Sequence, residues 1–159
     1  MNRSIQTFMD YGIQVLLITV VFGSLNAQQT GINTIKSRIY QSIIQDHLNA
    51  PSNATIEDFD ENINQISSDF DGEKWPFIQY SDVSREGFDN RIHLNNLVKM
   101  AVAYKSNASK YFKDKSLFQK IVNGLHFWCK NDFVGENWWN NQIGTPTSLI
   151  ELMLVIGEQ

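Results

Sequence analysis

Residues 137–146 read Asn-Trp-Trp-Asn-Asn-Gln-Ile-Gly-Thr-Pro. Trp138 and Trp139 are adjacent, and neighbouring residues on a helix or strand point in different directions, so a loop is the more natural place for the pair. Side by side in a loop, two indoles form a broad apolar surface among side-chain amides. Such a surface suits a sugar, because its C–H faces stack on indole while amides offer both donors and acceptors. The alternative is a loop whose tryptophans fill the core between two helices, since large apolar groups are usually buried.

The segment after this stretch has the pattern of a helix. Thr145 suits an N-cap and Pro146 suits the first helical position. Residues 149–156 are then apolar nearly all round, which predicts a helix buried on several sides. The sequence ends at Gln159, about one turn later, so we expect a truncated chain or the first piece of a larger helical domain.

The segments before the stretch also show helical spacing. Apolar residues recur at intervals of three and four within four segments, which are 30–50, 56–66, 94–104 and 117–128. Thr55 and Asp58 fit a capping box, and residues 68–89 predict a structured loop with aromatic anchors. No alternating strand pattern occurs, so an all-α solenoid or toroid of helical hairpins is more natural than a simple four-helix bundle.

Composition and reactive side chains narrow the function. A net charge of -4 over 159 residues argues against a nucleic-acid partner. His47, His93 and His126 have no metal-ligand spacing, and the acidic run after Thr55 fits a helix start, so we predict no metal site and no cofactor. Cys129 is the single cysteine and is predicted to be a buried, inert thiol.

Residues 1–27 are interpreted as a secretory signal peptide. Arg3 precedes an uncharged, mostly apolar run from Ile13 to Leu25, and Leu25-Asn26-Ala27 offers a cleavage site. An uncleaved membrane anchor is the alternative, although the run is short for a membrane span. We therefore expect a secreted or periplasmic chain of residues 28–159, without stable membrane insertion after cleavage.

The motifs resemble one enzyme family. Residues 137–146 look like the Asn-Trp-Trp…Ile-Gly-x-Pro motif of family 8 polysaccharide lyases, which comprise chondroitin AC, hyaluronate and xanthan lyases. Three upstream stretches are similar to the same family: Tyr80-Ser81-Asp82-x-Ser84-Arg85, His93-Leu94 and Ala101-x-Ala103-Tyr104. The resemblance covers roughly residues 71–156.

The resemblance implies a fold, a substrate and a set of binding residues. Family members are secreted, carry an N-terminal incomplete α/α toroid followed by β-sandwich domains, and cleave uronic-acid-containing polysaccharides by β-elimination. Carried over by position, Trp138 and Trp139 would form the aromatic patch that positions the polymer. Asn137 would be an amide lining the cleft, and Gln142 a further substrate-binding amide. An acidic polysaccharide, a glycosaminoglycan or xanthan, is thus the expected partner.

The resemblance also implies that catalysis lies elsewhere. In these lyases the catalytic Asn, His, Tyr and Arg follow the Trp-Trp motif, and Tyr80, His93, Tyr104 and His126 precede it. β-Elimination needs a carboxylate neutraliser together with a positioned base. We therefore predict an N-terminal lyase fragment that is inactive alone, with the missing C-terminal lyase portion as a second partner.

Two hypotheses without catalysis stay open beside the lyase fragment. One is a stand-alone helical module that binds glycans. The other is a helical interaction protein in which Trp138 and Trp139 anchor the core or a protein interface.

Overall fold

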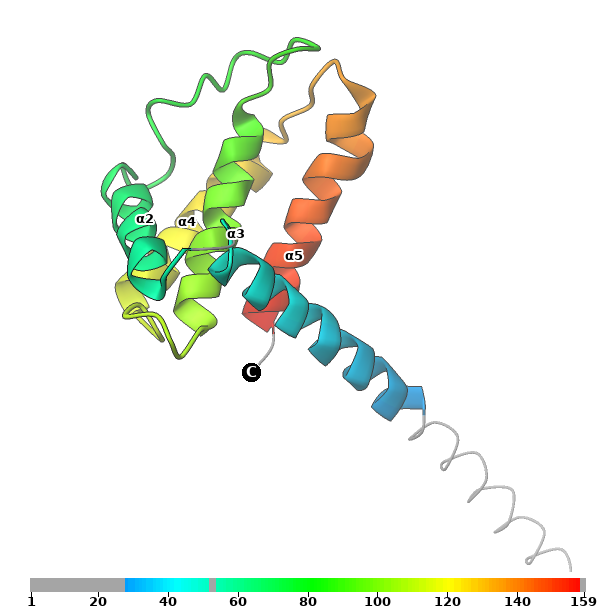
Figure 1. Cartoon of the computed structure of the whole chain (residues 1–159). Helices are drawn as coiled ribbons and strands as arrows, with labels where there is room; N and C mark the ends of the chain where they lie inside the picture. The colour runs from blue at the N-terminus through cyan, green and yellow to red at the C-terminus, as the bar shows by residue number, and fades with distance from the viewer. Residues whose placement is uncertain (1–27, 52–53, 158–159) are drawn as a thin grey trace, which may run out of the picture. The chain divides into compact units, whose positions relative to one another are not determined.

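The computed structural model describes residues 28–51 and 54–157, and helices are its regular elements (Figure 1). A helix over 28–48 is followed by α2 (Ile56–Ser68), α3 (Asn90–Lys105), α4 (Lys115–Asn131), a π-helical turn η1 (Asn140–Gly144) and α5 (Thr145–Gly157). No strand occurs in this part of the chain, so the predicted all-α class is confirmed. The predicted signal peptide, residues 1–27, lies outside the described residues.

The described residues belong to two compact units, with the boundary between Ile39 and Tyr40. In the first unit, residues 28–39 are helical, and the apolar side chains Ile32, Ile35 and Ile39 are exposed. The second unit contains the remaining elements and the hydrophobic core. No helix within the described ranges is both long enough and apolar enough to cross a membrane.

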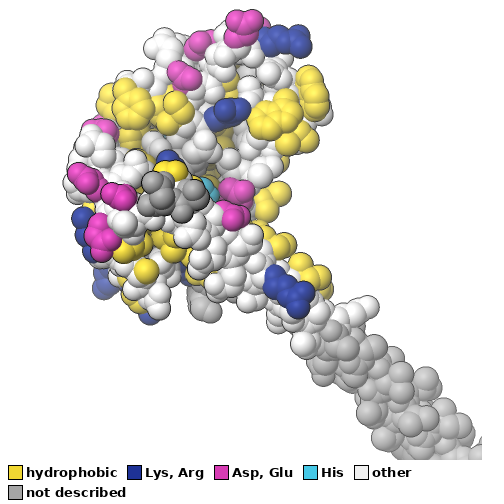
Figure 2. All heavy atoms as spheres, in the orientation of Figure 1, with side chains coloured by type: hydrophobic (Ala, Val, Ile, Leu, Met, Phe, Trp, Pro, Cys, Tyr) yellow, Lys and Arg dark blue, Asp and Glu magenta, His cyan; other side chains and the backbone are white. Residues whose placement is uncertain are grey.

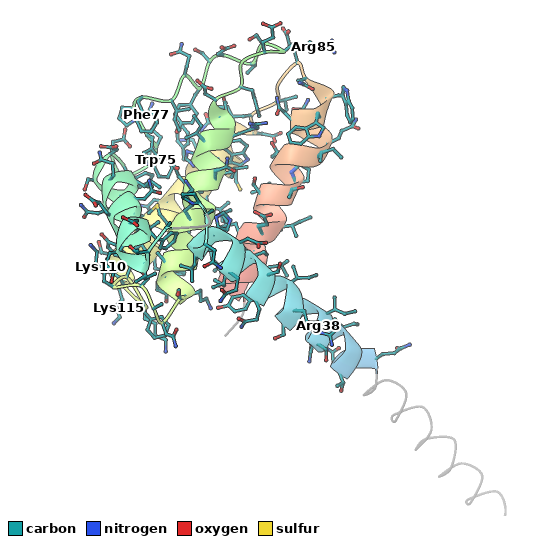
Figure 3. All side chains as sticks on the ribbon, in the orientation of Figure 1. Arg38, Trp75, Phe77, Arg85, Lys110 and Lys115 are labelled. Atoms are coloured by element: carbon teal, nitrogen blue, oxygen red, sulfur yellow. The ribbon has the colours of Figure 1, made fainter. Side chains whose placement is uncertain are left out.

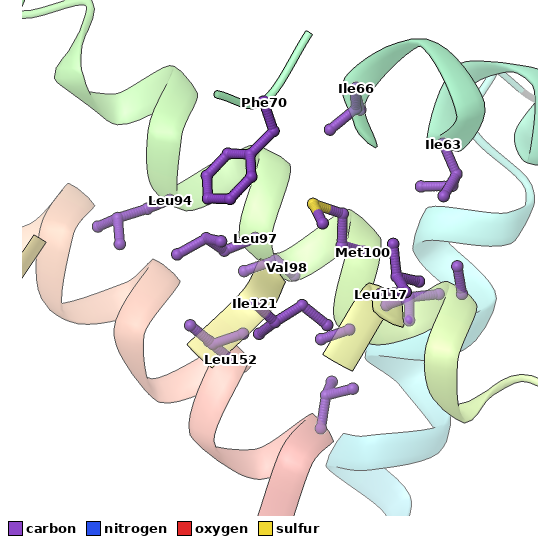
Figure 4. Packing of buried hydrophobic residues seen from close by; sticks show 14 of the residues in the cluster. Ile63, Ile66, Phe70, Leu94, Leu97, Val98, Met100, Leu117, Ile121 and Leu152 are labelled. Atoms are coloured by element: carbon purple, nitrogen blue, oxygen red, sulfur yellow. The ribbon is translucent and has the colours of Figure 1, made fainter. Parts of the chain in front are cut away.

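Helix α3 is the centre of the second unit. It packs against α2, α4 and α5, and Figure 4 shows side chains from these helices converging on it. Its buried residues lie on nearly every side of the helix: Asn90, His93, Leu94, Asn96, Leu97, Val98, Met100, Ala101, Val102 and Ala103. Sequence periodicity predicted a single apolar stripe here, but a helix with neighbours on three sides also buries some of its polar residues, here Asn90, His93 and Asn96.

Helix ends follow their local capping signals. The Thr55 side chain accepts a hydrogen bond from the Asp58 N–H, and the Asp58 carboxylate accepts one from the Thr55 N–H, which confirms the capping box. The same Thr55 bonds lower the pKa of Asp58. Asp114 caps α4 by accepting a hydrogen bond from the Leu117 N–H at 2.8 Å, and α4 ends at Asp132 in the left-handed conformation.

Cys129 is exposed, so the prediction of a buried thiol was wrong. Trp128 and Leu117 of the same helix face the core and are buried. The next residue after Trp128 is turned by about 100° on a helix, which places the Cys129 side chain on the solvent side. Adjacency to a core tryptophan therefore does not predict burial.

The irregular segment 69–89 is fixed to the helices by a chain of hydrogen bonds. The Trp75 N–H donates to the Tyr80 Oη at 3.2 Å, and the Tyr80 hydroxyl lies 2.9 Å from His93 Nδ1. His93 Nε2 lies 2.8 Å from the Gly124 carbonyl oxygen. Because a carbonyl can only accept, Nε2 carries the proton and Nδ1 accepts from Tyr80. The segment predicted to be a loop with aromatic anchors is thus joined to α3 and α4 by a chain of hydrogen bonds through half-buried Tyr80 and buried His93.

Candidate functional site

Trp138 and Trp139 lie in the first turn of a helix, not in a loop as the sequence predicted. The helical conformation begins at residue 138, passes through η1 and continues as α5. Asn137 caps this start, because its Oδ1 accepts a hydrogen bond from the Trp139 N–H at 3.1 Å. Thr145 is therefore not an N-cap, and Pro146 is not at a first helical position.

The π-helical turn explains how Pro146 fits inside this continuous helix. Proline lacks the N–H that would bond to the carbonyl four residues earlier, and its ring collides with that carbonyl in a regular α-helix. The Thr145 N–H bonds instead to the Asn140 carbonyl, five residues back, so the helix is wider just before the proline. The sequence signals for a helix start at Thr145 thus mark a wide turn instead.

Both tryptophans of the pair are exposed, which distinguishes them from the other two in the chain. Trp138 is 58% exposed and Trp139 is 42% exposed, whereas Trp75 is 0% and Trp128 is 3% exposed. Figure 2 shows apolar side chains with basic ones among them on the surface of the second unit. We call the exposed pair Trp138 and Trp139 the aromatic platform.

The position of the Trp139 ring is set by a glycine and an arginine. A Cβ added at Gly144 would lie 2.8 Å from the Trp139 Cζ3 atom, so any larger residue would displace the indole. The Arg91 guanidinium of α3 lies 5.6 Å from the Trp139 ring centroid, in cation–π range. Trp139 is therefore held between η1 and α3 with part of its surface open.

The four amides of the motif have different roles. Asn140 is buried, and its Oδ1 lies 3.5 Å from Arg91 Nη1. Asn141 bonds to both the N–H and the carbonyl of Gly135. Asn137 uses one lone pair as the cap and one N–H toward the Arg85 carbonyl at 3.4 Å, so a second lone pair and a second N–H remain. Gln142 is exposed.

Replacing Asn141 by Ala is expected to destabilise the fold by about 2 kcal/mol, because its two hydrogen bonds to the backbone of Gly135 disappear. The adjacent change Gln142→Ala is the matched control and should stay within about 0.5 kcal/mol of the wild type. Urea unfolding of the two variants measures the difference. An equal loss of stability in both variants would contradict the structural role of the Asn141 hydrogen bonds.

A hollow of about 270 Å³ lies on one side of Trp139. It is lined by the end of the segment 69–89, the first turns of α3, and the start of the helical segment that begins at residue 138. Figure 3 shows Arg85 at the tip of that segment. The lining residues of this first hollow are Arg85, Glu86, Gly87, Phe88, Asp89, Arg91, Ile92, Asn95, Asn137, Trp139 and Asn140.

A second hollow of about 450 Å³ shares the Trp139 wall with the first one. It lies between α3 and the helical segment of η1 and α5. Its lining residues are Arg91, Asn95, Trp139, Ile143, Gly144, Thr147, Ser148 and Glu151. Arg91, Asn95 and Trp139 therefore border both hollows, which adjoin at Trp139, whereas Trp138 lines neither of them.

The charged groups of the two hollows carry no ion pairs with one another. Within the described residues, Arg85, Arg91 and Glu151 have no partner at salt-bridge distance, and burial, followed by the charge of Asp46, raises the pKa of Glu151. The sequence predicted Asn137, Trp138, Trp139 and Gln142 as site residues. It did not single out Arg85, Arg91 or Glu151. Arg91 and Glu151 lie on α3 and α5 outside any motif, so their place in the hollows depends on how these two helices pack. Arg85 lies in the segment 69–89, at the end of the upstream stretch that resembles the family.

The Tyr80–His93 pair lies in the interior and not in either hollow. His93 is fully buried, and the exclusion of water lowers its pKa to about 4, although the bond to Gly124 opposes this. Burial likewise raises the pKa of Tyr80 to about 12. Both side chains are hydrogen-bonded within the fold, and the absence of a catalytic role for them stays a prediction.

Three comparisons with known proteins agree on one family. A family model described as the N-terminal alpha-helical domain of polysaccharide lyase family 8 matches residues 33–159. Chondroitinase-AC of Pedobacter heparinus is 28% identical over 132 residues, which is 83% of this chain and 18% of the relative. Hyaluronate lyase HylB of Enterococcus faecalis is 28% identical over 76 residues, which is 45% of this chain and 8% of the relative.

The fold has a solved counterpart. A chain of chondroitinase AC lyase, from a structural study of enzyme–oligosaccharide complexes, matches with a TM-score of 0.65 and 22% sequence identity. The match covers 77% of this chain and 18% of that chain. The helical arrangement is thus the one predicted, part of an incomplete α/α toroid, and the present chain spans less than a fifth of these chondroitinase relatives.

Proposed function

This chain belongs to polysaccharide lyase family 8 through that family's N-terminal alpha-helical domain, and from this membership we propose that it binds a uronic-acid-containing polysaccharide of the chondroitin, hyaluronan or xanthan type. In this proposal, Trp138 and Trp139 stack on sugar rings, while Asn137 and Gln142 bind hydroxyl groups. The chain is the N-terminal part of a secreted lyase, and these 159 residues bind the polymer without cleaving it.

The exposure of the aromatic platform is the observation that carries this proposal. Indole side chains left in water cost free energy of about 2 kcal/mol each relative to burial, so an adjacent exposed pair points to a ligand that covers them. The hollows on both sides of Trp139 offer room for consecutive sugar units. Polymer that crosses the platform would contact both hollows at once.

The basic residues support an anionic polymer. Arg91 borders both hollows and Arg85 borders the first, and within the described part of the chain neither forms an ion pair with the carboxylates that also line these hollows. A guanidinium presents a fork of donors that matches a carboxylate or sulfate. The names of the relatives, a chondroitinase and a hyaluronate lyase, point to the same class of polymer.

Binding without cleavage is supported by the state of the Tyr–His pair. A half-buried Tyr80 hydroxyl whose pKa is raised to about 12, and which is bonded to buried His93, is poorly matched to proton transfer near neutral pH. Neither of the two hollows contains a tyrosine or a histidine. In this proposal the base and the carboxylate neutraliser come from the C-terminal lyase portion, which is the expected protein partner.

A protein-interaction module is the second candidate, and exposed apolar side chains on α5 favour it. Leu152 and Val155 face the core, whereas Ile150 is 51% and Met153 is 60% exposed on the other side of the helix. This surface is the one on which we expect a lyase partner segment to pack. The same surface would serve an unrelated protein if the chain did not bind glycans.

Titration of the full chain with hyaluronan, chondroitin sulfate and xanthan tests the proposal. We expect a saturable change in tryptophan fluorescence with at least one polymer and none with neutral dextran. Absorbance in the ultraviolet band of an unsaturated uronate, followed in the same samples, should stay flat. Rising absorbance would contradict binding without cleavage, and the absence of any saturable change would favour the interaction module.

A further inference from the structure

The second hollow contains one carboxylate, that of Glu151. Glu151 is half-buried on α5 and lines the second hollow together with Thr147 and Ser148, which lie about one turn earlier on the helix. Within the described residues, its carboxylate has neither a hydrogen-bond donor nor a cation at bonding distance. A half-buried carboxylate without a partner is costly, so a group that donates hydrogen bonds would be favoured beside it.

The two hollows therefore differ in the group that each can accept. The first has Arg85 and Arg91 together with the exposed carboxylates of Glu86 and Asp89. The second has a single cation, Arg91, which is shared with the first hollow and lies over the Trp139 ring. Beyond that shared wall, the second hollow offers the hydroxyls of Thr147 and Ser148 and the carboxylate of Glu151, which are acceptors for an uncharged sugar.

We propose that Glu151 determines specificity in the second hollow, where it accepts hydrogen bonds from an uncharged sugar unit and disfavours a sulfated one. This inference rests on the proposed function, because it assumes that the polymer crosses the aromatic platform. An anionic unit lies against Arg85 and Arg91 on one side of Trp139, and the neighbouring uncharged unit lies against Glu151 on the other. A sulfate ester on that second unit brings a negative charge close to a partly desolvated carboxylate, which weakens binding.

Affinities for matched hexasaccharides of unsulfated chondroitin and chondroitin 6-sulfate test this proposal in the full chain. The wild type should bind the unsulfated form more tightly. Glu151→Gln, which keeps the shape and removes the charge, should tighten binding of the sulfated form about fivefold and weaken binding of the unsulfated form about twofold. The ratio of the wild-type affinities for the unsulfated and the sulfated form should also decrease at high salt, because the repulsion between the sulfate and Glu151 is partly screened.

Two further variants separate the possible outcomes. Glu61→Gln removes an exposed carboxylate of α2, far along the chain from either hollow, and should leave the preference unchanged. Ser148→Ala should weaken binding of the unsulfated form without tightening binding of the sulfated form. The test therefore does not depend on the folding of a single variant. An unchanged preference in Glu151→Gln would overturn this inference alone, whereas a wild type that binds neither oligosaccharide would overturn the proposed function and this inference with it.

Discussion

The double substitution Trp138→Ala/Trp139→Ala is expected to reduce affinity for the polysaccharide at least about 100-fold. A tryptophan at the centre of an interface commonly contributes about 2 kcal/mol or more, and each 1.4 kcal/mol changes affinity tenfold. Because both indoles are exposed, the free energy of unfolding should change by less than about 1 kcal/mol. Titration followed by calorimetry measures the affinity, since the variant lacks the fluorescent reporters.

The control for this experiment is an exposed aromatic residue elsewhere. Phe77 is 62% exposed in the segment 69–89 and is absent from both hollows, and Figure 3 shows its position. Phe77→Ala should leave the affinity unchanged. If the double variant retained wild-type affinity, or if Phe77→Ala lost as much, the aromatic platform would not be the binding surface.

The second large effect is a loss of stability in mild acid. Burial holds the pKa of His93 at about 4 in the folded chain, against 6.5 when it is unfolded. Between these values the unfolded state binds more protons, so stability is fully present above pH 6.5 and falls as the pH approaches 4. The pKa shift of His93 predicts that the free energy of unfolding decreases by about 3 kcal/mol between pH 6.5 and pH 4. Urea unfolding at pH 7.5, 5.5 and 4.5 would follow it.

Variants assign the acid sensitivity to this residue. His93→Gln should be less stable at pH 7.5 but should show a shallower pH dependence between 6.5 and 4.5. The residual slope comes partly from His47, whose pKa is also lowered, mainly by burial. His126→Gln, an exposed site on α4, is the matched control and should keep the wild-type slope. A slope in His93→Gln equal to that of the wild type would show that His93 is not the group responsible.

Much of the helical architecture could be predicted because its signals are local. The spacing of Phe59, Ile63 and Ile66 and the capping pair Thr55–Asp58 mark α2 without reference to any other segment. Cys129 and the Thr145–Pro146 signal failed for the opposite reason. The direction of a side chain depends on helical phase, and a proline inside a helix is tolerated where the neighbouring backbone forms a wide π turn.

The candidate site could be predicted only in part. The motif identified Trp138 and Trp139, because adjacent tryptophans among amides are unusual in a core. Arg91 and Glu151 belong to helices separated by a long stretch of sequence, and they meet only because α3 packs against α5. Their lack of ionic partners is a property of the packed structure, which composition and periodicity do not contain.

Contact between the polymer and the aromatic platform can be observed through the indole N–H signals of the full chain in a two-dimensional nitrogen–proton NMR spectrum. The chain has four tryptophans, so four signals are expected, each assigned by a Trp→Phe variant. Addition of unsulfated chondroitin hexasaccharide should shift the signals of Trp138 and Trp139. The signals of Trp128 and of Trp75, whose indole N–H donates to the Ile66 carbonyl inside the core, should stay in place. If saturating ligand left the Trp138 and Trp139 signals unmoved, the polymer would not be bound on the aromatic platform.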